Sequence, residues 1–273
     1  MQESVADNRW SIVKLLKGQY RFFSLRVKSM ILRVIDWKNR SRQPLPVPPP
    51  MLRYRVHGRL KADGYLEIGK RCANDIKSLV RTTGKELFDF NRVLDFGCGN
   101  GRVIRNFYDK PESCQLYGTD IDKDSINWCR NHLPLAQWDV NDFMPPMKYA
   151  DGSFDCVYAI SVFTHLDEEM QFAWLKELNR VTKPGAILVL TIHGRSLFSQ
   201  LNRAKRELLE EKGIYFDVFQ TGAFKHDGLP DFYQTTYHTR NYINSRWSEY
   251  FEIIEYVEKG MNDHQDAVIL KRR

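Results

Sequence analysis

Apolar residues recur at two spacings along the chain, and the alternation between them predicts secondary structure. Short continuous apolar runs suit buried strands, whereas apolar positions three or four residues apart suit helices that pack on one face. Strands that alternate with helices of 10–15 residues are typical of a parallel sheet covered on both faces. The expected strands are 91–96, 114–119, 136–140, 154–160 and 186–192, and the expected helices are 65–81, the glycine-rich loop to about 108, 123–132 and 167–181.

The last part of the chain departs from this alternation. Two strands are expected over 250–257 and 267–271, with only a loop between them, which predicts an antiparallel hairpin at one edge of the sheet. The preceding segment, 195–249, is long for a connection and holds a charged helix at about 201–212. Long ordered connections often act as lids, so we expect 195–249 to be an insertion on the substrate side.

Apolar positions at helical spacing also run through residues 10–37, with lysine and arginine side chains on another face. Five prolines follow within 44–50, which neither a helix nor a central strand accommodates. The pattern predicts a basic amphipathic helical extension and a proline-rich linker over 1–50. It then predicts a single α/β domain over 51–273.

Composition sharpens this division of the chain. The hydrophobic fraction of 42% and charged fraction of 27% are those of an ordinary globular protein, which excludes wholesale disorder. Residues 1–50 hold ten Lys and Arg against three acidic residues, while the other 223 residues hold 31 of each. The net charge of +7 therefore belongs entirely to the N-terminal extension.

The five cysteines include no C-x-x-C pair, which supports neither a disulfide framework nor a zinc site. We expect no bound metal. The N-terminus lacks an uninterrupted apolar core followed by small residues, and no apolar run approaches the ~20 residues of a membrane span. These features predict a cytoplasmic protein.

The most informative stretch is the loop that follows the first expected strand. Three glycines, Gly97, Gly99 and Gly101, stand at alternate positions between the strand and the next element. Glycines there allow the backbone to turn sharply and lie against a ligand. A dinucleotide fingerprint would need a glycine at position 102, which is Arg102. Asp95 directly precedes the loop and suits a cationic group better than a pyrophosphate.

Two further acidic residues end the next two expected strands. Asp120 lies 19 residues past Gly101, where a carboxylate accepts hydrogen bonds from both hydroxyls of a ribose. Asp139 ends the third strand, where it would receive an adenine amino group. A single aspartate at a strand end is as often a helix cap or a turn residue. Three such residues at three consecutive strand ends, however, favour a nucleoside site.

Taken together and in order, these motifs resemble those of class I S-adenosylmethionine-dependent methyltransferases. The resemblance spans roughly 51–273 and implies a three-layer αβα, Rossmann-like fold with a seven-stranded sheet whose last strand is antiparallel. It is carried by the segments VLDFGCGNGR (93–102), LYGTDID (116–122), WDVNDF (138–143), FDCVYAISVFTHL (154–166) and LNRVTKPGAILVLTIHG (178–194).

The resemblance implies S-adenosylmethionine as cofactor and assigns residues to it. Gly97, Cys98 and Gly99 would pack on its amino-acid portion, in a loop that Gly101 completes. Asp95 would hold its amino group and Asp120 its ribose hydroxyls. The others would lie against the adenine or near the methionine end: Ile121, Asp139, Val140 and Ser161.

A hydroxyl acceptor of the methyl group would need a general base, for which histidine is the usual residue near neutral pH. His165 follows the fourth strand and His193 ends the fifth, so both open onto the same crevice. Sugar O-methyltransferases of this class are similar in placing a histidine base at the position of His165. The alternative for each is a residue that only caps a helix or a turn.

The insertion supplies candidates for acceptor binding, because aromatic rings and hydroxyls suit carbohydrate acceptors. Most of its aromatic residues are expected to pack the insertion onto the sheet. Tyr233, Tyr237 and His238 are the ones expected to face the substrate. The C-terminal segments resemble bacterial methyltransferases associated with glycan and secondary-metabolite synthesis. This implies O-methylation of a sugar, a glycan or another small hydroxylated acceptor.

Two other functions stay open. A nucleic-acid methyltransferase would use the basic extension for phosphate contacts, but 51–273 has no net charge, and Ile160-Ser161-Val162-Phe163 replaces the N/D-P-P-Y/F run of such enzymes. We therefore expect no nucleic acid as partner. A non-catalytic, S-adenosylmethionine-binding partner protein is the other function. The extension over 10–37 would either lie peripherally on an anionic membrane or pack on the body or a second subunit.

Overall fold

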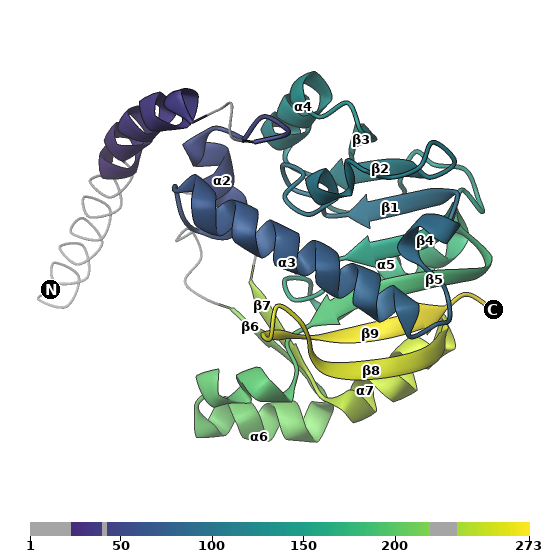
Figure 1. Ribbon diagram of the computed structural model, residues 1–273. Helices are drawn as coiled ribbons and strands as arrows, with labels where there is room; N and C mark the ends of the chain where they lie inside the picture. The colour runs from purple at the N-terminus through teal and green to yellow at the C-terminus, as the bar shows by residue number, and fades with distance from the viewer. Residues whose placement is uncertain (1–22, 40–42, 219–233) are drawn as a thin grey trace, which may run out of the picture.

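A seven-stranded sheet in the order β3-β2-β1-β4-β5-β9-β8 forms the centre of the protein (Figure 1). The computed structural model describes residues 23–39, 43–218 and 234–273. Strands β1 to β5 pair in parallel, and β9 pairs antiparallel with both β5 and β8, which confirms the predicted α/β sheet with its antiparallel last strand. The strands are β1 (Arg92–Phe96), β2 (Gln115–Asp120), β3 (Ala136–Val140), β4 (Phe154–Ala159), β5 (Thr182–Ile192), β8 (Glu252–Met261) and β9 (Gln265–Lys271).

Helices cover both faces of this sheet. Neighbouring residues of β1 point to opposite faces: Val93 packs into the core beneath α3 and α4, and Leu94 into the core beneath α5 and α7. The side chains of both cores are buried, which is why the central strands β4 and β5 are rich in apolar residues. The helices are α2 (Pro50–His57), α3 (Ala62–Arg81), α4 (Lys123–His132), α5 (Glu168–Val181), α6 (Arg203–Lys212) and α7 (Arg240–Arg246).

One predicted helix is not formed. The segment from the glycine-rich loop to about residue 108 is instead a series of turns and a single 3₁₀ helix, η3 (Ile104–Phe107). The side-chain amide of Asn106 donates to the carbonyl oxygens of Arg102 and Val103, both at 3.0 Å. Such bonds occupy acceptors that an α-helix would use. The prediction was wrong here because this local competition is invisible to apolar spacing.

The N-terminal segment is tied to the body through a helix that the sequence did not predict. Residues 23–38 are helical, and α2 begins at Pro50. The guanidinium of Arg53 in α2 is fully buried and donates to the carbonyl oxygens of Leu60 and Pro48. It also donates to Asp36 of the first helix at 2.8 Å. The proline-rich segment therefore packs beside a buried cation that holds both helices.

The Asp36–Arg53 ion pair yields the first testable prediction. Replacing Asp36 by asparagine should lower the free energy of unfolding by about 1 kcal/mol, because a charge-assisted hydrogen bond becomes a neutral one while Arg53 keeps its carbonyl partners. Urea unfolding would measure the change. Asp109→Asn, at an exposed loop residue, is the control. An equal loss in both variants would show that the ion pair contributes nothing.

The described parts of the expected insertion, 195–218 and 234–249, fold beside the carboxyl ends of β4 and β5. Its own two-stranded sheet pairs β6 (Ile214–Asp217) with β7 (Thr235–His238) in antiparallel fashion. The backbone N–H of Thr236 donates to the Thr164 carbonyl, and that of His238 donates to the His193 carbonyl. These bonds hold β7 against the ends of both strands. These described parts therefore lie on the side where the functional site is expected.

Candidate cofactor and acceptor site

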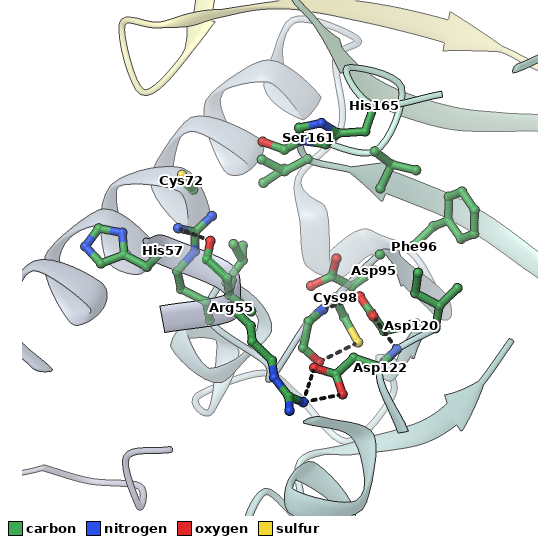
Figure 2. Close-up of a pocket in the computed structure, with 18 of the residues that line it drawn as sticks. Arg55, His57, Cys72, Asp95, Phe96, Cys98, Asp120, Asp122, Ser161 and His165 are labelled. Carbon is green, nitrogen blue, oxygen red and sulfur yellow. Dashed lines mark hydrogen bonds and ion pairs between the residues drawn. The ribbon is translucent and has the colours of Figure 1, made fainter. Parts of the chain in front are cut away.

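A cavity of about 670 Å³ opens at the carboxyl ends of β1, β2 and β4 (Figure 2). Its volume is within the range of small-molecule sites, and it lies where ligands bind in open parallel sheets. The structure brings seven of the ten predicted cofactor residues to its wall. They are Asp95, Gly97, Cys98, Gly99, Asp120, Ile121 and Ser161.

The glycine-rich loop needs its glycines for two separate reasons. Gly97 has φ +77°, and a Cβ atom there would lie 2.2 Å from a methyl carbon of Val162. Gly99 has φ +55°, and its Cβ would lie 2.8 Å from a methyl carbon of Val56. Both conformations are ones that residues with side chains rarely adopt. The loop is thus a tightly packed cradle whose backbone forms the floor of the cavity.

Gly101 has a different role from the one expected. It does not line the cavity, and a Cβ atom there would lie 2.7 Å from a methyl carbon of Leu133 and 3.0 Å from the ring of Trp138. The glycine is therefore required for packing of the loop on α4 and β3. Its contribution to a ligand is indirect.

Asp120 is fixed in place by backbone donors. Its Oδ2 accepts a hydrogen bond from the Gly99 N–H at 2.7 Å, and its Oδ1 accepts one from the Asp122 N–H at 2.8 Å. Burial raises the pKa of this carboxyl, and the two backbone bonds act in the opposite direction. Each oxygen retains a second lone pair for a hydroxyl donor. This geometry suits a pair of ribose hydroxyls.

Asp95 is the deepest acidic group of the cavity. Its side chain is almost fully buried, and the Tyr158 hydroxyl donates to its Oδ2 at 3.0 Å. Burial raises the pKa of Asp95 to about 8, with a smaller contribution in the same direction from Asp120, while the Tyr158 hydrogen bond opposes it. A cationic group would stabilise the ionised form of this carboxyl. The site is therefore suited to an ammonium group.

The structure does not bring Asp139 or Val140 to the cavity. The Asp139 carboxylate accepts a hydrogen bond from the Tyr149 hydroxyl at 2.8 Å and pairs with Lys148. Asn141 lines the cavity instead, with its Oδ1 accepting from Thr119 at 2.8 Å. The cavity is thus lined by a residue two positions past the predicted Asp139, because a loop downstream of β3 engages the Asp139 carboxylate.

One wall of the cavity comes from α2, which sequence reasoning missed. Arg55, Val56 and His57 all line the cavity. The Arg55 guanidinium lies 3.1 Å from both carboxylate oxygens of Asp122 and 3.0 Å from Asp124, as Figure 2 shows for Asp122. The helix thereby covers the glycine loop. Its sequence, PMLRYRVH, has no apolar periodicity that would have revealed it.

His165 projects into the other end of the cavity, near Ser161 (Figure 2). Its Nδ1 lies 2.6 Å from the carbonyl oxygen of Gln234. Because a carbonyl only accepts, Nδ1 carries the proton and the lone pair of the neutral ring lies on Nε2. Burial lowers the pKa of His165 to about 4, and the bond to Gln234 opposes the shift. The imidazole is therefore neutral at pH 7.

His193 lies behind His165 and is not among the described residues that line the cavity. The two ring centroids are 6.3 Å apart. Burial lowers the pKa of His193 to about 3, and the neighbouring imidazoles of His165 and His264 add to this. His264 does line the cavity. Of the two histidines that neighbour His193, both therefore reach the cavity wall, whereas His193 itself does not.

None of the described residues of the insertion that were predicted to bind the acceptor lines the cavity. Tyr233 lies outside the described residues. Tyr237 is buried, and its hydroxyl donates to Gln200 at 3.2 Å. His238 is fully buried, with its Nε2 3.0 Å from Gln171 Oε1. Both side chains therefore pack the insertion onto the sheet and lie outside the cavity wall.

The residues that are present fit S-adenosylmethionine. The half-buried carboxylate of Asp120 suits a ribose and the buried one of Asp95 an ammonium group, and the close packing of Gly97 and Gly99 lets the loop backbone line the cavity without side chains. Within the described part of the chain, no group of three or more His, Cys, Asp or Glu side chains is arranged to hold a metal ion. The five cysteines are free and buried.

Comparison with known proteins supports this interpretation. Residues 93–185 match the family model described as a methyltransferase domain. The curated 2-methyl-6-phytyl-1,4-hydroquinone methyltransferase of Synechocystis sp. is 36% identical over 36% of this chain and 30% of its own length. The fatty-acid O-methyltransferase of Mycolicibacterium smegmatis is 28% identical over 46% of this chain and 48% of its own.

The solved structures extend the likeness to most of the fold. A 1,6-didemethyltoxoflavin-N1-methyltransferase from Burkholderia thailandensis, solved with S-adenosylhomocysteine, aligns with a TM-score of 0.54 and 11% identity. The alignment covers 84% of this chain and 93% of that one. The chain spans about a third of the length of the first curated relatives that it matches. Residues 93–185 thus match a methyltransferase-domain model, and the chain shares its fold with this S-adenosylhomocysteine-bound methyltransferase.

Proposed function

We propose that the chain is an S-adenosylmethionine-dependent methyltransferase that methylates a hydroxyl group of a sugar, a glycan or another small acceptor. The observation that carries this proposal is that one cavity contains both the residues suited to the cofactor and a candidate general base. Asp95, Asp120 and the glycine cradle lie at one end, and the neutral imidazole of His165 lies at the other. One curated relative is named an O-methyltransferase and the solved neighbour an N1-methyltransferase, so the choice of an oxygen acceptor rests on His165 as a base.

Each part of the cofactor has a partner in this chain. Asp120 would accept from the ribose hydroxyls, Asp95 would hold the ammonium group, and Asn141 would lie at the adenine side. The backbone of 97–99 would pack along the amino-acid portion. The bound cofactor supplies a methyl group on a sulfonium, which is electrophilic without further activation. The protein's task is then to exclude water, align the acceptor and receive its proton.

His165 is proposed to receive that proton. Its Nδ1 is committed to the Gln234 carbonyl, so the ring orientation is fixed and Nε2 carries the lone pair. The acceptor hydroxyl would donate to Nε2, and its proton would move there as the oxygen gains the methyl group. The His193 ring would pack against the His165 ring and help to fix its orientation. Of the two predicted catalytic histidines, we therefore propose His165 as the base and His193 as a positioning residue.

A nucleic-acid acceptor fits the site less well. The cavity mouth carries Asp122 and Asp124, which neutralise Arg55 and leave no surplus of positive charge for a phosphate backbone there. The basic residues of the N-terminal helix lie on a separate element. A non-catalytic binding partner remains the second candidate, and it differs from the enzyme only in failing to methylate any acceptor.

Cofactor affinity tests the assignment of Asp120. We expect Asp120→Ala to weaken S-adenosylmethionine binding about 30-fold in titration calorimetry, because two hydroxyl–carboxylate hydrogen bonds are lost. Asp142→Ala, at an exposed position past β3, should leave the affinity unchanged. Thermal melting would show that both variants fold. Equal affinity of the Asp120→Ala variant and the wild type would contradict the site.

Methyl transfer itself is tested with radiolabelled S-adenosylmethionine and a panel of sugar nucleotides, glycolipids and phenols. Label incorporated into a sugar-containing acceptor supports the proposal. Tight cofactor binding without labelling of any panel member would favour the non-catalytic partner. Labelling restricted to an added RNA or DNA would favour the nucleic-acid alternative.

A further inference from the structure

The helix over residues 23–38 presents an apolar stripe to solvent. Met30 is 70% exposed and Phe23 is 66% exposed, which is unusual for side chains of this size. The stripe recurs every three or four residues, so it lies along one face of the helix. Its exposed members are Phe23, Val27, Met30, Ile31, Val34, Ile35 and Trp37.

The opposite face of this helix is the one attached to the body. Ser29 is 4% exposed, and Asp36 forms the ion pair with the fully buried Arg53 of α2. Ser29 and Asp36 are seven residues apart and therefore lie on the same side of the helix. The attachment fixes which face points outward. The apolar stripe is thus held away from the body by a defined contact.

Basic side chains border the stripe on both sides. At 100° per residue, Lys28 lies beyond one edge of the stripe and Arg33 beyond the other, and both are exposed. Lys38 falls within the same surface, while Asp36 is turned toward Arg53. A second copy of this chain would bring like charges together at such a contact. An apolar stripe bordered by cations matches the interface of a membrane with anionic headgroups.

We propose that the helix over 23–38 docks the protein on an anionic lipid surface, with the stripe at the headgroup boundary and Lys28 and Arg33 against the headgroups. The helix lies in the plane of the surface, at a length of roughly 24 Å for its sixteen residues. None of the helices in the described part of the chain is long and apolar enough to cross a membrane.

The position of the helix connects this surface to the proposed reaction. Arg53 of α2 holds the helix, and Arg55, Val56 and His57 of the same α2 form a wall of the cavity. Figure 1 places the helix beside α2, on the side toward which β1 and β4 point. The cavity and the docking stripe therefore lie on neighbouring parts of the molecule. Resting on the proposed function, the acceptor is an amphiphile, such as a lipid-linked sugar, that the surface presents.

Flotation of the full-length protein with vesicles tests the docking. We expect binding to phosphatidylcholine vesicles that contain phosphatidylglycerol, and much weaker binding to phosphatidylcholine alone. Lys28→Gln with Arg33→Gln should weaken binding to the anionic vesicles about 30-fold, because two basic residues near the surface are lost. Met30→Glu with Val34→Glu should abolish it. Leu208→Glu, at an exposed apolar residue of α6, is the matched control and should bind as the wild type does.

Calorimetry with S-adenosylmethionine separates this inference from the proposed function. Unchanged cofactor affinity in variants that no longer float supports docking, whatever the acceptor is. Equal flotation of the variants and the wild type, or no flotation of the wild type, would overturn it. A wild-type dimer in sedimentation that Met30→Glu dissociates would instead assign the stripe to a second copy. Flotation gained only after deletion of residues 1–22 would assign it to the chain's own N-terminus.

Discussion

Replacing His165 by asparagine is expected to lower kcat by about 10²–10⁴-fold while the affinity for S-adenosylmethionine stays within a factor of two or three. Asparagine keeps a side-chain N–H near the position of Nδ1, so the hydrogen bond to the Gln234 carbonyl can be retained. It has no group in place of Nε2. The variant therefore removes the proposed base and keeps the local fold.

The neighbouring histidine provides the control. His193→Asn should reduce kcat far less than His165→Asn, because His193 does not line the cavity. Initial rates with a panel compound that the wild-type enzyme methylates would measure both effects. A larger loss in the His193 variant would reverse the proposed order of roles. Unaltered turnover of His165→Asn would remove the base assignment altogether.

The pH profile gives a second readout of the same assignment. The pKa of His165 is lowered to about 4, so the imidazole stays unprotonated as the pH falls from 8 to 5. At saturating S-adenosylmethionine, kcat should therefore stay constant from pH 8 to about 5 and be half lost only near pH 4. An acid limb of kcat with an apparent pKa near 6.5 under these conditions would indicate a solvated histidine as base, such as one outside the cavity.

More of the residues predicted to bind the cofactor reach the cavity than of those predicted to bind the acceptor, for a physical reason. Residues at the ends of parallel strands share one edge of a sheet, so the order of strands alone places Asp95 and Asp120 together. Helix α4 was likewise predicted with its observed bounds, because Asp122 caps it by accepting from the backbone of Asp124 and Ser125. These features depend on local sequence and on topology.

Features that depend on distant side chains could not be predicted in the same way. Asp139 occupies the expected strand end, yet Lys148 and Tyr149 of a later loop engage its carboxylate. Helix α2 is held by a buried Arg53, a residue that sequence patterns assign to the surface. Tyr237 has the ring and hydroxyl that could bind an acceptor, but its hydroxyl donates a hydrogen bond to Gln200 instead. In each case tertiary contacts decide which residues reach the cavity.

Substitution of Asp95 by asparagine is expected to weaken cofactor binding about 100-fold near pH 8 and to remove most of its dependence on pH below 8. In the ligand-free protein, burial raises the pKa of Asp95 to about 8, so at pH 7 the carboxyl is mostly protonated. An ammonium group favours the ionised form. Binding below pH 8 must therefore release a proton, and the affinity should rise about tenfold per pH unit from 6 toward 8.

S-adenosylhomocysteine is the suitable probe, because it has the same α-amino group and lacks the labile sulfonium. Its α-ammonium group lies beside a free carboxylate and keeps its proton through this range, so the affinity should fall again only at more alkaline pH, where the free ligand loses that charge. Calorimetry in buffers of different ionisation enthalpy would count the proton released at pH 6.5. Asp95→Asn should release none, because the amide does not titrate. A wild-type affinity that is flat from pH 6 to 8, or equal proton release in the variant, would show that Asp95 does not hold the ammonium group.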